Sequence, residues 1–277
     1  MITTFFADDR PIKPTSITTI VTDSPHSSTD TSMLVGTLAS LARVPGLSSS
    51  VRLVFDGGLL PRNFPPGSSF KCQQPVNLSA YASYKAHARQ AVMQLPMAAN
   101  LAFVELTVRG CLSGTVRAGV TGVTTRYVAV IQNDLPLQRS FSLRALLALM
   151  DTNPEVQKVS FSAGRNMCYV RQATITCRRH RRLGRASNFT TFHSTTPPIT
   201  AVQFWSDGNH VATMDHYRHV LKVVHSGSFM EANMFCLPWK NHSAWGTYLL
   251  GLPDDGHYSS HVNARNMSFS SNPCMNN

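Results

Sequence analysis

The sequence is poor in acidic residues and has no long apolar run. It contains 14 Asp and Glu against 25 Lys and Arg, and 14% of its 277 residues are charged, so the net charge of +11 reflects scarce acids more than abundant bases. That charge favours anionic partners such as phosphates, nucleic acid or acidic glycans. No stretch approaches the about 18 consecutive apolar residues of a transmembrane helix. We therefore expect no membrane-spanning segment.

Signals for secretion and for cysteine-based sites are also missing. The first nine residues lack the basic start and apolar core of a secretory signal, which predicts a cytoplasmic protein. The six cysteines are scattered, and none forms a Cys-x-x-Cys pair. This argues against a zinc ribbon and against a dense disulfide scaffold.

The clearest strand is the apolar, β-branched run from Tyr127 to Ile131, which ends in Gln132-Asn133-Asp134. In an open α/β sheet, ligands bind just beyond the carboxyl ends of the strands. A carboxylate there can hold a hard cation against a phosphate. Asp134 is therefore a candidate metal ligand, and the alternative is a cap of the turn before the next helix.

A strand–helix–strand unit opens the chain. The β-branched segment 17–22 leads into Asp23, helical spacing follows over 33–42, and strand 51–55 ends at Asp56-Gly57. Such a unit begins a mononucleotide-binding fold. Asp56 could accept hydrogen bonds from a base or ribose, or could simply form an Asp-Gly turn. No Gly-x-Gly-x-x-Gly motif is present, which argues against a dinucleotide.

The remaining elements alternate between strands and helices, which predicts one α/β domain over 16–266, between a flexible arm at 1–15 and a disordered tail at 267–277. The further predicted strands are 101–106, 156–163, 168–176, 201–205 and 245–251, and the further predicted helices are 80–93, 111–123, 143–150, about 217–224 and 229–235.

Six short segments in this order resemble a glycosyltransferase of the GT-A type, close to family 2. They are ITTIVTDS at 17–24, VFDG at 54–57, TRYVAVIQND at 125–134, WSDGNH at 205–210, FME at 229–231 and WGTY at 245–248. The sequence is also similar to sugar transferases ascribed to algae and large algal viruses. The resemblance implies a GT-A-like α/β fold, with a Rossmann-like mixed sheet flanked by helices. It also implies a nucleoside-diphosphate sugar donor and a glycan or other hydroxyl acceptor.

The resemblance also assigns donor-binding residues. The acid that holds the nucleoside matches Asp56, and the family's Asp-x-Asp metal motif matches residues 132–134, where Gln132 replaces the first acid. One carboxylate suffices for Mn²⁺ or Mg²⁺ when phosphates and water complete the coordination. A late histidine would be a further ligand, with His261 preferred over His257. The residues expected to hold the donor and its ion are Asp23, Asp56, Gln132, Asn133, Asp134 and His261.

The resemblance assigns catalysis to Glu231, which matches the acid that opens the family's late helix. Inverting members often carry a Glu-Asp pair there, whereas this chain has Ala232, so Asp207 is the alternative base. Glu231 could instead complement the helix dipole. Trp205 and Trp245 could stack on a sugar, although core positions are commoner for tryptophan.

The competing interpretation is a nucleic-acid-binding or interaction protein on a degenerate transferase fold. It draws on the net charge and on the arginines at 178, 179, 181, 182 and 185, which could alternatively close over a diphosphate or form a solvated loop. Those bases are not interleaved with aromatics, and no nucleic-acid-binding motif is present. We therefore expect a transferase without a stable nucleic-acid partner.

Overall fold

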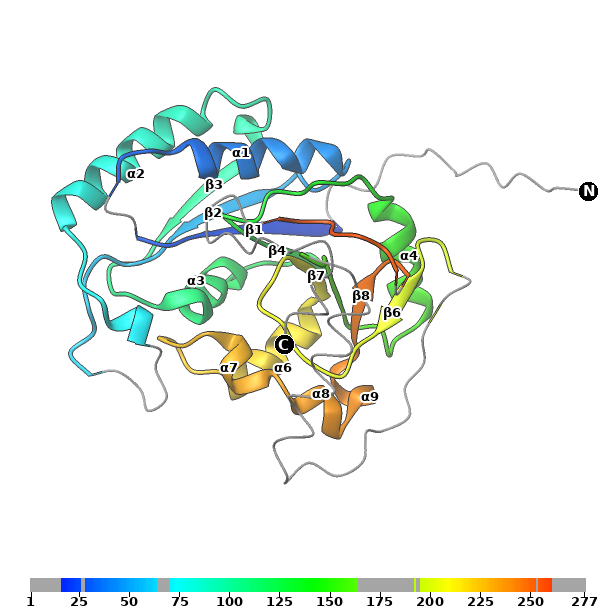
Figure 1. The fold of residues 1–277 in the computed structure, drawn as a ribbon. Helices are drawn as coiled ribbons and strands as arrows, with labels where there is room; N and C mark the ends of the chain where they lie inside the picture. The colour runs from blue at the N-terminus through cyan, green and yellow to red at the C-terminus, as the bar shows by residue number, and fades with distance from the viewer. Residues whose placement is uncertain are drawn as a thin grey trace, which may run out of the picture.

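The computed structural model describes residues 16–25, 28–63, 70–163, 192, 195–252 and 254–260. Its centre is an eight-stranded sheet in the order β3-β2-β1-β4-β7-β5-β8-β6 (Figure 1). The strands are β1 Ile17–Asp23, β2 Val51–Phe55, β3 Leu101–Glu105, β4 Tyr127–Gln132, β5 Lys158–Ser160, β6 Ile199–Ala201, β7 His210–Thr213 and β8 Thr247–Leu250.

The sheet is mixed. Strands β3, β2, β1 and β4 run parallel, whereas β7 is antiparallel to both of its neighbours, β4 and β5. Strand β8 is parallel to β5, and β6 is antiparallel to β8. The order 3-2-1-4 is that of a Rossmann-like sheet, whose ligand crevice opens where the order reverses, between β1 and β4. The predicted fold class, a Rossmann-like mixed sheet flanked by helices, is confirmed.

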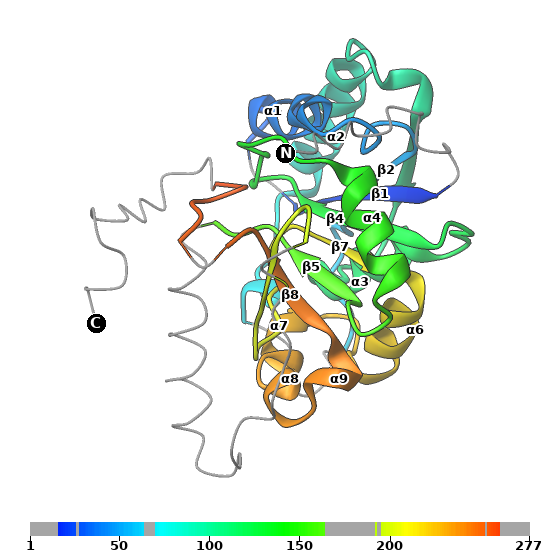
Figure 2. The same cartoon turned by 90° about the vertical axis from the view of Figure 1, so that its right-hand side faces the viewer.

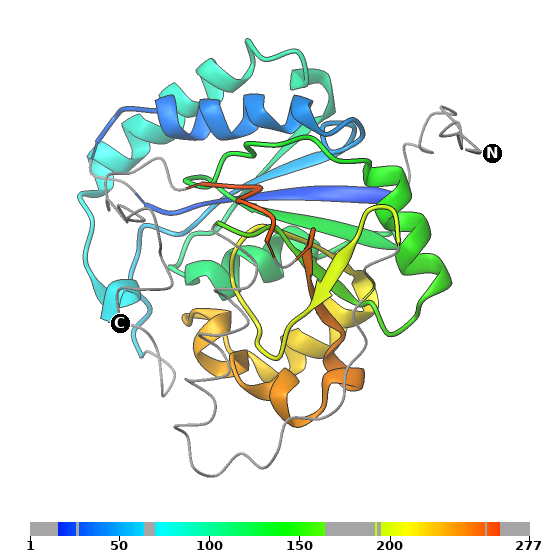
Figure 3. The same ribbon diagram turned by 45° about the vertical axis from the view of Figure 1, so that its right-hand side comes forward.

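Helices cover both faces of the sheet (Figures 1 and 3). The first apolar core packs one face against α1 (Ser32–Ser40), α2 (Leu78–Val92) and α4 (Leu143–Thr152). The second packs the other face against α3 (Cys111–Val120), α6 (Met214–Val223) and α7 (Met230–Met234). Two short helices, α8 (Leu237–Lys240) and α9 (His242–Trp245), precede β8.

Local sequence explains where several helices begin. Asn77, Ser142 and Thr213 each cap a helix by accepting a backbone N–H with the side chain. Gly119 has a different purpose, because a Cβ there would meet the side chains of Ile20 and Val54. The glycine that weakens α3 as an isolated helix therefore allows it to approach β1 and β2.

Several boundaries differ from the predictions. Strand β7 was not expected, and the predicted strand 201–205 is wrong because β6 ends at Ala201. The apolar pattern at 156–163 shortens to β5, and Trp245 lies in α9. Short buried segments are ambiguous by periodicity alone, which explains these errors. The predicted strand 168–176, the arm at 1–15 and the tail at 267–277 lie outside the described residues.

A disulfide joins Cys72, in the 3-10 helix η2 (Phe70–Gln73), to Cys111 at the start of α3. Cys236 is disulfide-bonded as well. Disulfides persist mainly in oxidising compartments, so the cytoplasmic location stays a prediction. In the part of the chain that the structure describes, no helix combines the length and apolarity needed to cross a membrane.

Candidate functional site

The carboxyl ends of β1, β2 and β4 are tied together at one edge of the sheet. The Asp56 N–H donates to the Asp23 carbonyl (3.0 Å), and the Asn133 N–H donates to the Thr22 carbonyl (3.1 Å). The buried Asp23 carboxylate accepts hydrogen bonds from Asn133 Nδ2 and from the Tyr84 hydroxyl (3.0 Å). Asp23 and Asn133 therefore meet at the crevice where the strand order reverses.

Asp56 is 2% exposed and binds backbone N–H groups. Its Oδ1 accepts from Gly57 (2.8 Å) and Gly110 (2.7 Å), and its Oδ2 accepts from Cys111 (3.0 Å). Burial raises the pKa of Asp56 to about 6, against the lowering effect of these hydrogen bonds and of Arg109. The carboxylate thus anchors the start of α3, and its contact with a nucleoside stays a prediction.

Arg109 is a buried cation beside this site that the sequence did not single out. Its Nε donates to the Gly57 carbonyl (3.1 Å), and one terminal nitrogen donates to the Gln74 carbonyl (2.8 Å). Its other terminal nitrogen, Nη2, is buried without a hydrogen-bond partner among the described residues. A buried donor without a partner is costly in free energy.

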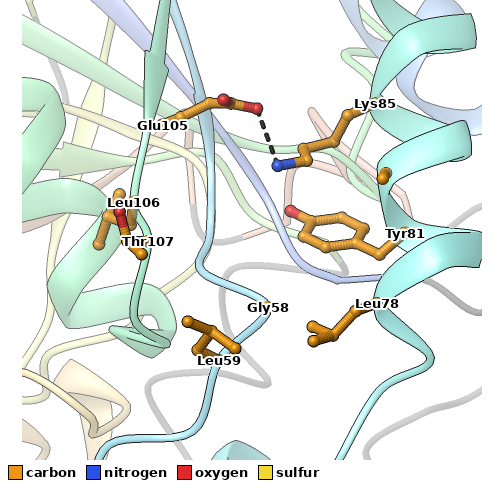
Figure 4. Close-up of a pocket in the computed structure, with 9 residues that line it drawn as sticks. Gly58, Leu59, Leu78, Tyr81, Lys85, Glu105, Leu106 and Thr107 are labelled. Carbon is orange, nitrogen blue, oxygen red and sulfur yellow. Dashed lines mark ion pairs between the residues drawn. The ribbon is translucent and has the colours of Figure 1, made fainter.

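A pocket of about 270 Å³ opens between α2 and the ends of β2 and β3 (Figure 4). The Tyr81 ring lines it, and the Tyr81 hydroxyl donates to the Asp56 carbonyl (2.8 Å). Lys85 Nζ lies 2.9 Å from Glu105 Oε1 and 5.0 Å from the centre of the Tyr81 ring. The pocket approaches the size of small-ligand sites, and it combines apolar, aromatic and charged groups.

The tip of β4 connects the crevice to the turn before β7. Gln132 Nε2 donates to the Asp207 carbonyl (2.7 Å), and the Gln132 N–H donates to Asn209 Oδ1 (2.9 Å). Asp134 lies two residues beyond Gln132 in the chain and is half-buried. Gln132, which stands where the resemblance leads one to expect the first acid of a metal motif, therefore binds the turn that carries Asp207.

Asp207 and Glu231 bind each other reciprocally. The Glu231 N–H donates to Asp207 Oδ1 (2.8 Å), and the Asp207 N–H donates to Glu231 Oε2 (3.1 Å). Asp207 is 8% exposed, and burial, followed by the charge of Glu231, raises its pKa. The two candidate bases thus form one unit that caps the start of α7.

The aromatic residues of the predicted motifs belong to the core. Trp205 is fully buried, and its Nε1 donates to His216 Nε2 (3.2 Å). Trp245 is buried against His219, with ring centroids 4.7 Å apart. His210 bridges the Gly208 carbonyl and the Tyr217 hydroxyl. The core interpretation of both tryptophans therefore fits the structure, sugar stacking does not, and His210 is likewise a buried core residue.

The predicted metal site is described only in part. His261 and the arginines at 178, 179, 181, 182 and 185 lie outside the described residues, and the alternative ligand His257 is exposed. Within the described ranges, no three His, Cys, Asp or Glu side chains are grouped so that they could hold an ion. The described side chains therefore do not enclose an ion, and the role of Asp134 as a metal ligand stays a prediction.

No protein-family model matches the sequence, and no curated protein matches it. The solved structures that match this chain include two of low identity. One is a 4-diphosphocytidyl-2C-methyl-D-erythritol synthase from Anaerococcus prevotii, with 10% identity, a TM-score of 0.38, and coverage of 76% of this chain and 75% of that one. The other is a mannosyltransferase from Pyrobaculum calidifontis in complex with GDP-Man and Mn²⁺, with 14% identity, a TM-score of 0.45 and coverage of 89% of this chain. The match spans 58% of the mannosyltransferase.

Proposed function

We propose that this chain is a metal-assisted glycosyltransferase that moves a sugar from a nucleoside-diphosphate sugar to an acceptor hydroxyl. The observation that carries the proposal is the connected edge of the sheet. Hydrogen bonds link Asp56, Asp23 and Asn133 across the crevice. The adjacent Gln132 binds the turn that carries Asp207, and Asp207 is hydrogen-bonded to Glu231 of α7. A donor site and a base would thus be neighbours, as group transfer requires.

The donor would lie along this edge. The pocket beside Tyr81 has room for a base-sized ring, and the uncompensated nitrogen of Arg109 would bind an anionic oxygen. Asp134, with His261 as a further ligand, would hold Mn²⁺ or Mg²⁺ together with the diphosphate. That ion, when bound, would neutralise charge that develops on the leaving group.

Glu231 would be the general base of an inverting reaction. The acceptor oxygen bonds to the anomeric carbon while the bond from that carbon to the diphosphate oxygen breaks, and the hydroxyl proton passes to the Glu231 carboxylate. The diphosphate leaves with the bonding electrons. Since burial and Glu231 raise the pKa of Asp207, a proton shared by the pair would reside on Asp207. Glu231, rather than Asp207, is therefore the proposed base.

The test is turnover of UDP- and GDP-sugars with Mn²⁺ by the wild type and by Asp134→Ala and Glu231→Gln. We expect each variant to keep its fold and to lose at least about 100-fold in kcat/KM. Asp215→Ala is the matched control, because it removes an exposed carboxylate of α6 that pairs with Arg218. Unchanged turnover in Asp134→Ala would remove the metal assignment, and unchanged turnover in Glu231→Gln would remove the base.

A further inference from the structure

A lysine that the proposed chemistry does not use lies beneath the Asp207–Glu231 pair. Lys158 is in β5, which Figure 2 shows between β7 and β8, and its side chain is 0% exposed. Its Nζ donates to Ser160 Oγ (2.7 Å) and to the Ser206 carbonyl (2.8 Å), and it lies 4.5 Å from the centre of the Trp205 ring. A buried ammonium group is expensive unless nearby anions and hydrogen bonds compensate it.

A single peptide group links Lys158 to Glu231. The carbonyl of the Ser206–Asp207 peptide accepts from Lys158 Nζ, and the N–H of the same peptide donates to Glu231 Oε2. One peptide dipole is therefore held between a cation and an anion, and each end strengthens the bond at the other. The Ser206 hydroxyl adds a longer bond to the same Glu231 oxygen (3.4 Å).

His210 and His216, the titratable groups next to the turn that carries Asp207, do not supply a positive charge. Burial and the charge of Lys158 hold the pKa of His210 well below its usual range, and the same causes lower the pKa of His216 to about 3. Both imidazoles are therefore neutral near pH 7. Burial lowers the pKa of Lys158 itself to about 7, against the raising effect of the charges of Asp207 and Glu231. In its protonated form, Lys158 is the cation whose charge acts on Asp207, in opposition to that of Glu231.

We infer that Lys158 is a positioning residue for the Asp207–Glu231 base, acting through the Ser206–Asp207 peptide to orient and charge-balance Glu231. The inference rests on the proposed function. The simpler alternative is a lysine that only fills the core. The two roles of Lys158 predict different coupling to Glu231. A positioning lysine is energetically coupled to that carboxylate, and a core-filling lysine is not.

The first measurement is kinetic. Lys158→Met keeps the length of the side chain and removes its charge, and we expect kcat to fall by about ten-fold or more while the donor KM changes by less than about two-fold. In the Glu231→Gln background the same substitution should have no further effect, because the group that it orients is gone. Lys222→Met, which removes an exposed lysine of α6, is the control. Equal losses in both backgrounds would overturn the inference.

The second measurement does not need activity. Thermal midpoints of Lys158→Met, Glu231→Gln and the double variant form a cycle, and the double loss should be smaller than the sum of the single losses. The cycle of Lys222→Met with Glu231→Gln should be additive. If the wild type turns over no donor, the proposed function fails, and this cycle still decides whether Lys158 and Glu231 are coupled. Additive losses at Lys158 would overturn the coupling.

If Lys158→Met does not fold, a milder variant tests the same inference. Ser160→Ala removes one acceptor of Lys158 Nζ and leaves the cation in place. We expect a several-fold lower kcat at constant donor KM, since the lysine is held less firmly. An unchanged kcat would count against the positioning role.

Discussion

Asp56 shows how one side chain can serve as backbone scaffolding at the point where a ligand is expected. Its two oxygens accept three N–H groups, two of them from residues 110 and 111 at the start of α3. A nucleoside would have to bind the remaining hydrogen-bond acceptor positions of these oxygens, or contact the neighbouring Tyr81. The position of α3 therefore depends on an acid more than 50 residues earlier in the chain.

We predict that Asp56→Asn destabilises the fold by about 1–3 kcal/mol, because an amide nitrogen replaces one acceptor of a buried N–H. Urea unfolding measures this. The substitution should also alter the pH dependence. Burial raises the pKa of Asp56 from about 3.8 in the unfolded chain to about 6 in the folded protein. The native state therefore binds the extra proton, and stability is lost as pH rises from about 4 to 6.

The wild type should therefore lose up to ~3 kcal/mol more than Asp56→Asn over that interval. Asp215→Asn, at an exposed site, should reproduce the wild-type profile. Parallel profiles for the wild type and Asp56→Asn would show that Asp56 is not protonated in the native state.

At the scale of whole elements, helix packing decides the effect of a glycine. Gly36 lies on the exposed side of α1 with open space around it, whereas a Cβ at Gly119 of α3 would lie 2.5 Å from Ile20 Cγ2. Both positions are helical, so intrinsic propensity favours alanine at both. The two positions differ only in packing, because α3 lies too close to the sheet at Gly119 to leave room for a Cβ.

We predict that Gly36→Ala stabilises the protein by about 0.5–1 kcal/mol and that Gly119→Ala destabilises it by about 1–3 kcal/mol. The two variants are matched controls for each other in a single denaturation experiment. A stabilising Gly119→Ala would mean that α3 can move away from β1 without loss of packing.

At the scale of the whole molecule, two features favour different ligands. The net charge of +11 favours nucleic acid, whereas the connected sheet edge favours a nucleoside diphosphate. We predict that UDP or GDP with Mn²⁺ raises the thermal midpoint more than either component alone, since a ligand at 100 times its Kd adds about 2.7 kcal/mol to stability. Asp134→Ala should lose the Mn²⁺-dependent part. Tight, steeply salt-dependent binding of random DNA without any nucleotide shift would instead favour the nucleic-acid interpretation.

Local sequence was sufficient for the parallel half of the sheet. The strands from residue 17, from residue 51, from residue 101 and from residue 127 were predicted to within about a residue of their observed ends, which is inside the usual boundary error. The β-branched apolar content of β1, β2 and β4 reflects burial on both faces, whereas the edge strand β3 is partly exposed. Residues 132–134 were also expected at a strand end, where they lie. Strand β7 was missed because its four residues carry no distinguishing period.

The sequence by itself determined which segments form the parallel strands and their helices, because apolar periodicity and capping residues are local properties. Only the tertiary structure decided that Asp56 binds residues 110 and 111, that Glu231 meets Asp207, and that Lys158 is buried beneath both. Those relations join residues far apart in the chain. Burial and hydrogen-bond partners exist only once the sheet has brought them together, so no local pattern encodes them.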